Sequence, residues 1–389
     1  MFSSPLARLV EGPGYGRAIT FACISIPLAA FSSIQSSLYR RDFDFKMLFG
    51  ARLIGVLTPL LVTTPLAFFL RNFWALVIST IVQNLMLAVY LTLKSPWKPR
   101  LYYSWKQLKQ MLGFSMWTVF ESVSIWLTGY ADLFIVGTFL SQHYLGIYRT
   151  SMATVGGIVG IVTAATTPVL FASLSRLQDD REEFRRMFFR FQKIVGMLVV
   201  PIGFGIFVFG DVVTAVMLGR QWGEAVGFIG LWGLVSTVTI LFSHYASEVY
   251  RSLGRPRLSA LAQWLHIVVL VPVVYVFAQQ GFGKLYVARS LVRLETVLVN
   301  SMLLHVCCGI SSGKMLKNVF PAFAAGTIMA LAGFALRLLT QSLGWNLLFI
   351  LLCAVLYFAL LSLFPTEKEQ QLLRIKNHVV ARYVRYGKK

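Results

Sequence analysis

The sequence predicts an all-α, polytopic membrane protein with about eleven transmembrane helices. Hydrophobic residues make up 57% of the chain and charged residues only 13%, and the mean hydropathy is +0.70. This composition is too apolar for a soluble domain with a wetted surface. Eleven apolar runs are long enough to cross a hydrocarbon core of about 30 Å at about 1.5 Å of rise per residue. The chain is therefore expected to be a bundle of membrane-spanning helices.

The apolar runs fall into three successive groups. Three runs precede residue 110, at 18–39, 47–70 and 73–93. Six follow, at 111–139, 145–173, 194–216, 225–249, 258–278 and 284–308. Two more, at 319–338 and 344–364, precede a basic tail. The outer loops are short, the longest lying near 210–224, so no external domain is expected to hold a soluble active site.

The positive charges are concentrated in the loops on one side of the membrane. The net charge is +21 with 36 Lys and Arg residues. The loops after spans one, three, five, seven and nine, together with the tail, hold 26 of them, the opposite side holds six, and four lie within spans. This is the positive-inside pattern, so the C-terminus is expected in the cytoplasm and no nucleic-acid partner is expected. The basic tail should lie on anionic lipid headgroups.

The same pattern places residue 1 outside the cell. The first span begins only about 17 residues in, and no signal peptide precedes it. We expect an odd number of further spans upstream of this sequence; the alternative is an unusual protein whose N-terminus is translocated first.

Cysteine and histidine spacings predict neither a disulfide nor a metal site. The four cysteines lie in apolar spans without framework spacing, and the five histidines form no HExxH pattern. No cofactor and no catalytic residue are expected.

Four segments between residues 110 and 260 carry a family resemblance. They are "ADLFIVGTFLSQHYLGIYRTS", "TPVLFASLSRLQDDREEF", "VPIGFGIFVFGDVVTAVMLGRQWGEA" and "EVYRSLGRPR", with weaker support from "LYRRDFDFK" at 38–46. In order and spacing they resemble the oligosaccharide flippases (Wzx-like) of the MATE and MOP superfamily. Arg149 departs from the small or polar residue usual in this family at its place.

The resemblance implies fourteen spans, arranged as two six-helix lobes plus two additional helices. It makes the span at 111–139 the seventh. Residues 1–109 would then be a partial N-terminal lobe of three spans, 110–310 the C-terminal six-helix lobe, and 311–389 two additional helices and a basic cytoplasmic tail. The expected fold is a MATE/MOP-like two-lobe transporter with an incomplete N-terminal lobe.

The resemblance also implies a function. It is the flipping of polyprenyl-pyrophosphate-linked oligosaccharide units across the cytoplasmic (inner) membrane for polysaccharide or lipopolysaccharide export, by alternating access and without enzymatic chemistry. The expected partners are this lipid-linked oligosaccharide, membrane lipids and other polysaccharide assembly proteins, and H⁺ or Na⁺ coupling stays open. Three alternatives remain: a MATE-type small-molecule exporter, an inactive N-terminally truncated fragment, and a membrane glycan polymerase or ligase, which usually needs a large external loop.

Asp132 and Arg149 are predicted to form a structural ion pair. The spans at 111–139 and 145–173 run in opposite directions, and each of the two residues lies 8.5 positions from the midpoint of the turn between them. They should therefore lie at the same depth, where each would neutralise the other.

Glu121 is the ion-coupling candidate. It precedes Asp132 by 11 residues, about three helical turns, so both carboxylates share one helix face. Its depth-matched position on the next span is Gly160, which offers no charge. Glu121 should bind a proton, face a wet cavity or meet a cation on another helix.

A polar stripe on the ninth span supplies the expected substrate-binding residues. Arg289 and Arg293 are one turn apart, and Asn300 lies 11 residues after Arg289. Arginine suits pyrophosphate because its forked donors match phosphate oxygens. Two alternatives stay open: Arg289 would extend to the outer surface, and Arg293 would pair with Glu121 or Glu295.

Overall fold

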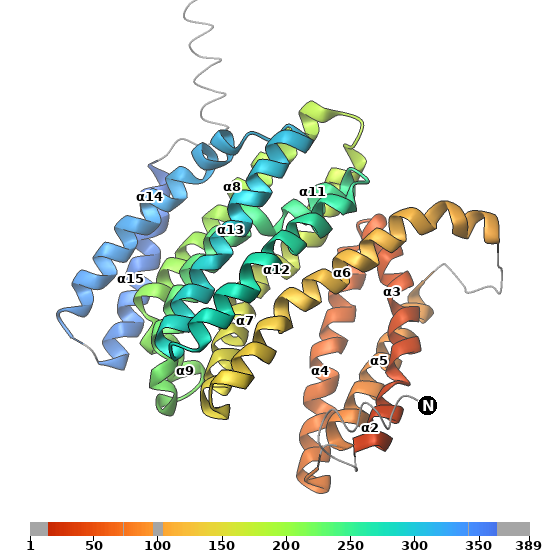
Figure 1. Ribbon diagram of the computed structural model, residues 1–389, viewed down its shortest axis with the longest axis horizontal. Coiled ribbons are helices and arrows are strands. Elements are labelled where there is room, and N and C mark those ends of the chain that lie inside the picture. Colours follow the sequence, from red (N-terminus) through yellow and green to blue (C-terminus); the bar gives the residue numbers. More distant parts are fainter. Residues whose placement is uncertain (1–14, 73, 96–103, 341, 364–389) are drawn as a thin grey trace, which may run out of the picture. The chain divides into compact units, whose positions relative to one another are not determined.

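A computed structural model describes residues 15–72, 74–95, 104–340 and 342–363 (Figure 1). Within these ranges every regular element is a helix. Eleven of the helices are long and apolar enough to cross a membrane. The predicted all-α, polytopic architecture is therefore confirmed. The first 14 residues and the basic tail from residue 364 lie outside the described residues, and so does the prediction that the tail lies on lipid headgroups.

The chain divides into two compact units, Met1–Gln107 and Leu108–Lys389. The first unit contains α2 (Tyr15–Ala22), α3 (Ser25–Arg41), α4 (Phe45–Leu70) and α5 (Trp74–Lys94), and α5 packs against both α3 and α4. Gly50 permits the close contact of α4 with α5, because any Cβ there would collide with the hydroxyl group of Tyr90. Polar side chains also join these helices: Gln35 Nε2 donates to Thr92 Oγ1 at 2.9 Å, as interhelical polar groups commonly do in membranes.

The second unit contains the remaining helices. They are α6 (Trp105–Phe139, which begins in the first unit), α7 (Gln142–Arg176), α8 (Arg181–Val208), α9 (Gly210–Met217), η1 (Arg220–Ala225), α10 (Val226–Thr239), η2 (Ile240–His244), α11 (Ala246–Ser252), α12 (Pro256–Ala278), α13 (Phe282–Cys308), α14 (Ser312–Arg337) and α15 (Leu343–Ser362). Helix α8 packs against α7, α10 and α14, and α15 packs against α14. The core of this unit thus surrounds α8.

The contact between α8 and α10 requires glycine. A Cβ at Gly203 would lie 2.8 Å from the Cβ of Thr237 and 3.0 Å from the carbonyl oxygen of Gly233. Small residues let membrane helices approach closely enough for van der Waals packing to hold them. Gly203 therefore sets how closely α8 and α10 pack.

Several helices begin earlier than the predicted spans, and two of these differences bear on the functional site. Helix α8 begins at Arg181 rather than near residue 194, because Asp180 caps it through the backbone NH groups of Glu182 and Glu183. The seventh span runs from Arg220 to Ser252 and is longer at both ends than the predicted 225–249. It is interrupted by a π turn at Ile240–His244, and its C-terminal part, α11, carries Arg251 into the bundle.

Candidate functional site: buried charges between α6, α11 and α13

Asp132 of α6 lies at the centre of a buried polar cluster. The residue is completely buried, and its Oδ2 accepts a hydrogen bond from Arg289 Nε at 2.6 Å and another from the Tyr148 hydroxyl at 2.7 Å. Arg289 is only 3% exposed. Side chains from α6, α7 and α13 therefore meet at one carboxylate.

The predicted pairing of Asp132 with Arg149 is wrong. Asp132 pairs with Arg289, and Arg149 is exposed. The depth argument predicted correctly which part of α7 lies near Asp132, since the Tyr148 hydroxyl donates to that carboxylate. Successive helical residues point about 100° apart, so the rotation of α7 that aims Tyr148 at Asp132 turns Arg149 away.

Glu121 meets a cation on another helix, the third of the expected alternatives. Its two carboxylate oxygens accept from Arg251, at 3.0 Å from Nε and 2.9 Å from Nη2. The third donor, Nη1, reaches Glu248 Oε1 at 3.0 Å. Such two-pronged contacts are the strongest geometry for an arginine and a carboxylate. Whether Glu121 couples transport to an ion stays a prediction.

Sequence reasoning missed Arg251. It belongs to the segment "EVYRSLGRPR" and was counted with the cytoplasmic loop after the seventh span, whereas α11 extends that span to Ser252. Glu248 and Arg251 are one helical turn apart. This spacing would have indicated in the sequence that the helix of the seventh span continues to Arg251.

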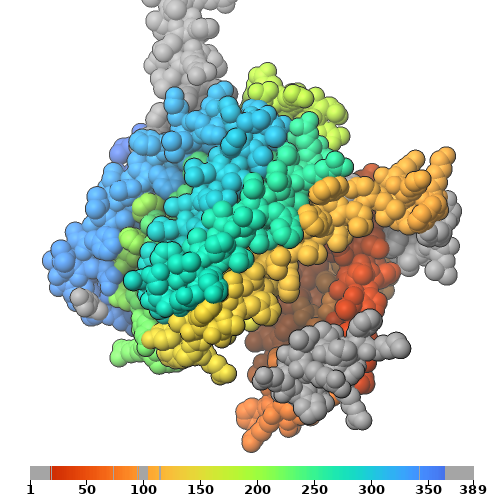
Figure 2. Space-filling view, viewed as in Figure 1, coloured from red at the N-terminus to blue at the C-terminus, as the bar shows by residue number. Residues whose placement is uncertain are grey.

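The two ion pairs hold α6 against the other helices of the second unit. Glu121 and Asp132 lie on one face of α6, and their partners lie on α11 and α13. Next to Glu121, Phe120 stacks on Trp264 of α12 with ring centroids 5.8 Å apart. Helices α6 and α12 accordingly lie side by side on the face of this unit shown in Figure 2. These contacts fix the rotation of α6 about its own axis.

The three residues of the predicted stripe on α13 have different surroundings. Arg289 is held by Asp132. Asn300 is buried, donates to Ser243 Oγ at 2.9 Å and accepts from the Tyr250 hydroxyl at 3.2 Å. These hydrogen bonds fit a structural role for Asn300.

Arg293 is the stripe residue that stays partly exposed. Its Nη1 donates to Ser236 Oγ at 2.7 Å, and its guanidinium carbon lies 4.1 Å from the centroid of the Trp232 ring. The alternative pairings are not formed, because Glu121 is bound by Arg251 and Glu295 by His266. Among the described residues no carboxylate lies within ion-pair distance of Arg293.

The π turn at Ile240–His244 aligns α10 with α13. Within the turn, the Leu241 carbonyl oxygen accepts from Gln192 Nε2 of α8 at 3.1 Å, and Asn318 in turn donates to Gln192. Ser243, within the turn, accepts from Asn300. Short π segments recur at functional sites because they redirect side chains. No sequence pattern had predicted this turn.

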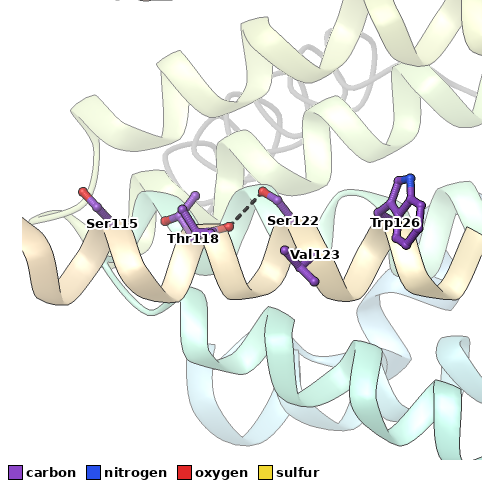
Figure 3. Close-up of a pocket in the computed structure, with 6 residues that line it drawn as sticks. Ser115, Thr118, Ser122, Val123 and Trp126 are labelled. Carbon is purple, nitrogen blue, oxygen red and sulfur yellow. Dashed lines mark hydrogen bonds between the residues drawn. The ribbon is translucent and has the colours of Figure 1, made fainter. Parts of the chain in front are cut away.

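The side of α6 that points away from Glu121 and Asp132 carries a pocket (Figure 3). It has a volume of about 530 Å³ and is lined by Ser115, Thr118, Val119, Ser122, Val123 and Trp126. Among the described residues, no group of three or more His, Cys, Asp or Glu side chains could hold a metal ion.

A family model described as "Polysaccharide biosynthesis protein" matches residues 1–227, more than half of the chain. The chain belongs to this family. The chain is also similar to the succinoglycan biosynthesis transport protein ExoT of Rhizobium meliloti, which is 22% identical over 60% of this chain and 47% of the relative. The lipopolysaccharide biosynthesis protein WzxC of Escherichia coli is 19% identical over 59% of this chain and 47% of the relative.

A further relative is described as a probable flippase. It is the low-salt glycan biosynthesis flippase Agl15 of Haloferax volcanii, 26% identical over 30% of this chain and 25% of the relative. These relatives confirm the predicted resemblance to Wzx-like flippases, and ExoT and Agl15 are named as transporters rather than enzymes. The chain spans about half the length of the first two relatives.

The fold of this family member is similar to that of a solved flippase. The lipid II flippase MurJ, in an inward closed conformation, superposes with a TM-score of 0.64. The match covers 90% of this chain and 72% of that chain, at 15% sequence identity. The predicted transporter fold is thus supported by a solved structure.

Proposed function

We propose that this member of the polysaccharide biosynthesis protein family moves a polyprenyl-pyrophosphate-linked oligosaccharide across the cytoplasmic membrane by alternating access. Relatives named as a transport protein and a probable flippase support this function, and so does the fold likeness to a flippase. The multi-pass helical architecture suits a substrate whose lipid part stays in the bilayer while its polar part crosses.

The observation that carries the proposal is that Arg293 lies within a spanning helix without a described carboxylate partner. Its charge is not neutralised by any described carboxylate, and one hydrogen bond and one aromatic ring hold the guanidinium in place. Its remaining donors are free to bind a phosphate oxygen. An intramembrane cation held in this way favours an anionic headgroup and disfavours cationic drugs.

The other charged residues have supporting roles in this proposal. Arg289, bound to Asp132, positions α13 and thereby Arg293, which follows one turn later. The Glu121–Arg251 pair is the candidate for H⁺ or Na⁺ coupling, because a cation that bound the Glu121 carboxylate would compete with Arg251 and loosen α6 from α11.

Location and partners belong to the same proposal. The positive-inside pattern supports a cytoplasmic C-terminus in the inner membrane, and other polysaccharide assembly proteins would supply the substrate and receive the product.

A binding experiment tests the function. The 389-residue chain would be purified in lipid nanodiscs, and its affinity measured for polyprenyl pyrophosphate and for tetraphenylphosphonium as a representative organic cation. We expect the pyrophosphoryl lipid to bind and Arg293→Ala to weaken it by about tenfold or more, the equivalent of one charge-assisted hydrogen bond. Arg149→Ala, at an exposed arginine, is the matched control. Preference for the organic cation would favour the small-molecule exporter instead.

The coupling role needs a separate measurement. If Glu121→Gln left transport and its dependence on pH and sodium unchanged in reconstituted vesicles, Glu121 would not be the coupling residue.

A further inference from the structure

One face of α6 combines hydroxyl groups with exposed aromatic rings. Ser115, Ser122 and Trp126 project from the same side of the helix (Figure 3). At about 100° per residue, Trp126 points about 140° away from Glu121. The two ion pairs that fix the rotation of α6 therefore also turn this face away from its own bundle.

The aromatic part of this face is a pair of stacked rings. Trp126 and Tyr130 stack with ring centroids 5.2 Å apart and planes inclined by 30°. Trp126 is 56% exposed and Tyr130 39%. The pair is rigid because each side chain has few rotatable bonds, so a ligand that packs on it loses little conformational entropy of the protein.

The hydroxyl part of this face can exchange hydrogen bonds. Ser122 Oγ donates to the Thr118 carbonyl oxygen at 2.8 Å, which leaves its own oxygen as an acceptor. Ser115 is exposed one helical turn before Thr118. Hydroxyl groups within a spanning helix gain from contact with water or a polar ligand, which hydrocarbon cannot offer.

The lack of an available charge on this face decides which ligands it can bind. Between Ser115 and Tyr130 the one charged residue of α6 is Glu121, which is buried and bound by Arg251. A pyrophosphate would find no cation on this face. A neutral ligand that has both apolar CH surfaces and many hydroxyl groups would find both kinds of contact, and a sugar is such a ligand.

We propose that the α6 face formed by Ser115, Thr118, Ser122, Trp126 and Tyr130 binds the oligosaccharide part of the transported lipid. A sugar ring packs on Trp126 and Tyr130, and its hydroxyl groups exchange hydrogen bonds with Ser115 and Ser122. This inference rests on the proposed function and divides recognition between two places in the second unit: Arg293 for the pyrophosphate and the α6 face for the glycan.

A comparison of two lipids tests the inference. The first is the lipid-linked oligosaccharide pool extracted from cells that express the gene; the second is polyprenyl pyrophosphate without saccharide. Wild-type chain in nanodiscs should bind the first more tightly. Trp126→Ala should weaken binding of the first roughly three- to tenfold, the range expected for one aromatic contact, and should leave binding of the second unchanged. Trp126→Phe, which keeps a ring, should retain most of the affinity.

The matched control is Trp345→Ala on α15. Trp345 is 55% exposed and is also close to a second aromatic ring, that of Phe349, so it controls for the loss of an exposed tryptophan elsewhere. Equal wild-type affinity for the two lipids, or equal losses in the Trp126 and Trp345 variants, would overturn the inference and leave the proposed function standing. Failure of both lipids to bind would overturn both.

A labelling experiment gives an independent readout. In a chain whose four native cysteines are replaced, Ser122→Cys should react with a charged, water-soluble thiol reagent, and the saccharide-bearing lipid should slow that reaction. Leu351→Cys, at a residue of α15 that is 62% exposed, should not react because it faces hydrocarbon. Equally low reactivity at both positions would mean that the α6 face lies in lipid, which contradicts glycan binding.

Discussion

At the scale of single residues, the choice of ionic partner decides how α6 is held. Arg289 donates to Asp132 through Nε alone, and Asp132 Oδ1 has no hydrogen-bond partner among the described residues. A buried pair with spare donors and acceptors contributes little net stability, but the loss of either partner leaves an uncompensated charge in a low-dielectric interior.

The Asp132–Arg289 pair predicts that the losses of stability in the two single variants do not add up in the double variant. Asp132→Asn and Arg289→Met should each destabilise the purified protein by about 3–5 kcal/mol, and the double variant should recover at least half of the summed loss. Thermal unfolding in detergent measures this effect. Arg149→Ala is the control and should change the unfolding temperature little; a large shift there, with additive effects at Asp132 and Arg289, would contradict the observed pairing.

Arg251 predicts a difference between arginine and lysine. Its three nitrogen donors contact three oxygens of Glu121 and Glu248, which a single ammonium group cannot reach at once. Arg251→Lys should therefore lower the unfolding temperature although the charge is kept. Arg220→Lys, at an exposed arginine, should not. Equal unfolding temperatures for these two variants would mean that the three contacts contribute no stability.

At the scale of helices, the contact of α8 with α10 depends on the absence of a side chain. Gly203 lies against Thr237 and Gly233, whereas a Cβ at Gly205, half a turn later on α8, would meet nothing within 4 Å. The two glycines therefore give opposite expectations for the same chemical change.

Gly203→Ala should destabilise the protein and Gly205→Ala should not. The first forces apart two packed helices and should cost about 1–3 kcal/mol, as overpacking does. The second replaces a poor helix former with a good one and should stabilise the helix by up to about 1 kcal/mol. Unfolding temperatures of the two variants measure the difference. Equal destabilisation would show that helix propensity, rather than the close contact, sets the need for glycine.

At the scale of the whole molecule, the distribution of cations predicts the orientation in the membrane. A fluorescent protein that folds only in the cytoplasm should be bright when fused after residue 389 and dark when inserted at Ser141, in the turn between α6 and α7. Alkaline phosphatase, active only outside, should give the reverse pattern. Fluorescence at both positions would contradict the predicted orientation.

Much of the fold could be predicted because the bilayer constrains it. A helix must satisfy its own backbone hydrogen bonds and present about 20 apolar residues, so the predicted runs and the eleven helices agree in number and order. Helix interruptions were not predictable in this way. The π turn at Ile240–His244 lies in an apolar run and is supported by Gln192, which is 49 positions distant in sequence.

The sequence by itself determined that this chain is a multi-pass helical protein of the polysaccharide biosynthesis family, because composition, hydrophobic length and motif order are properties of the chain. Only the tertiary structure decided which charges meet. Depth can be read from sequence position, but a pair also requires facing rotations, and packing sets the rotation of each helix. Asp132 therefore pairs with Arg289 rather than Arg149, Glu121 pairs with Arg251, and Arg293 keeps its charge free of any described carboxylate.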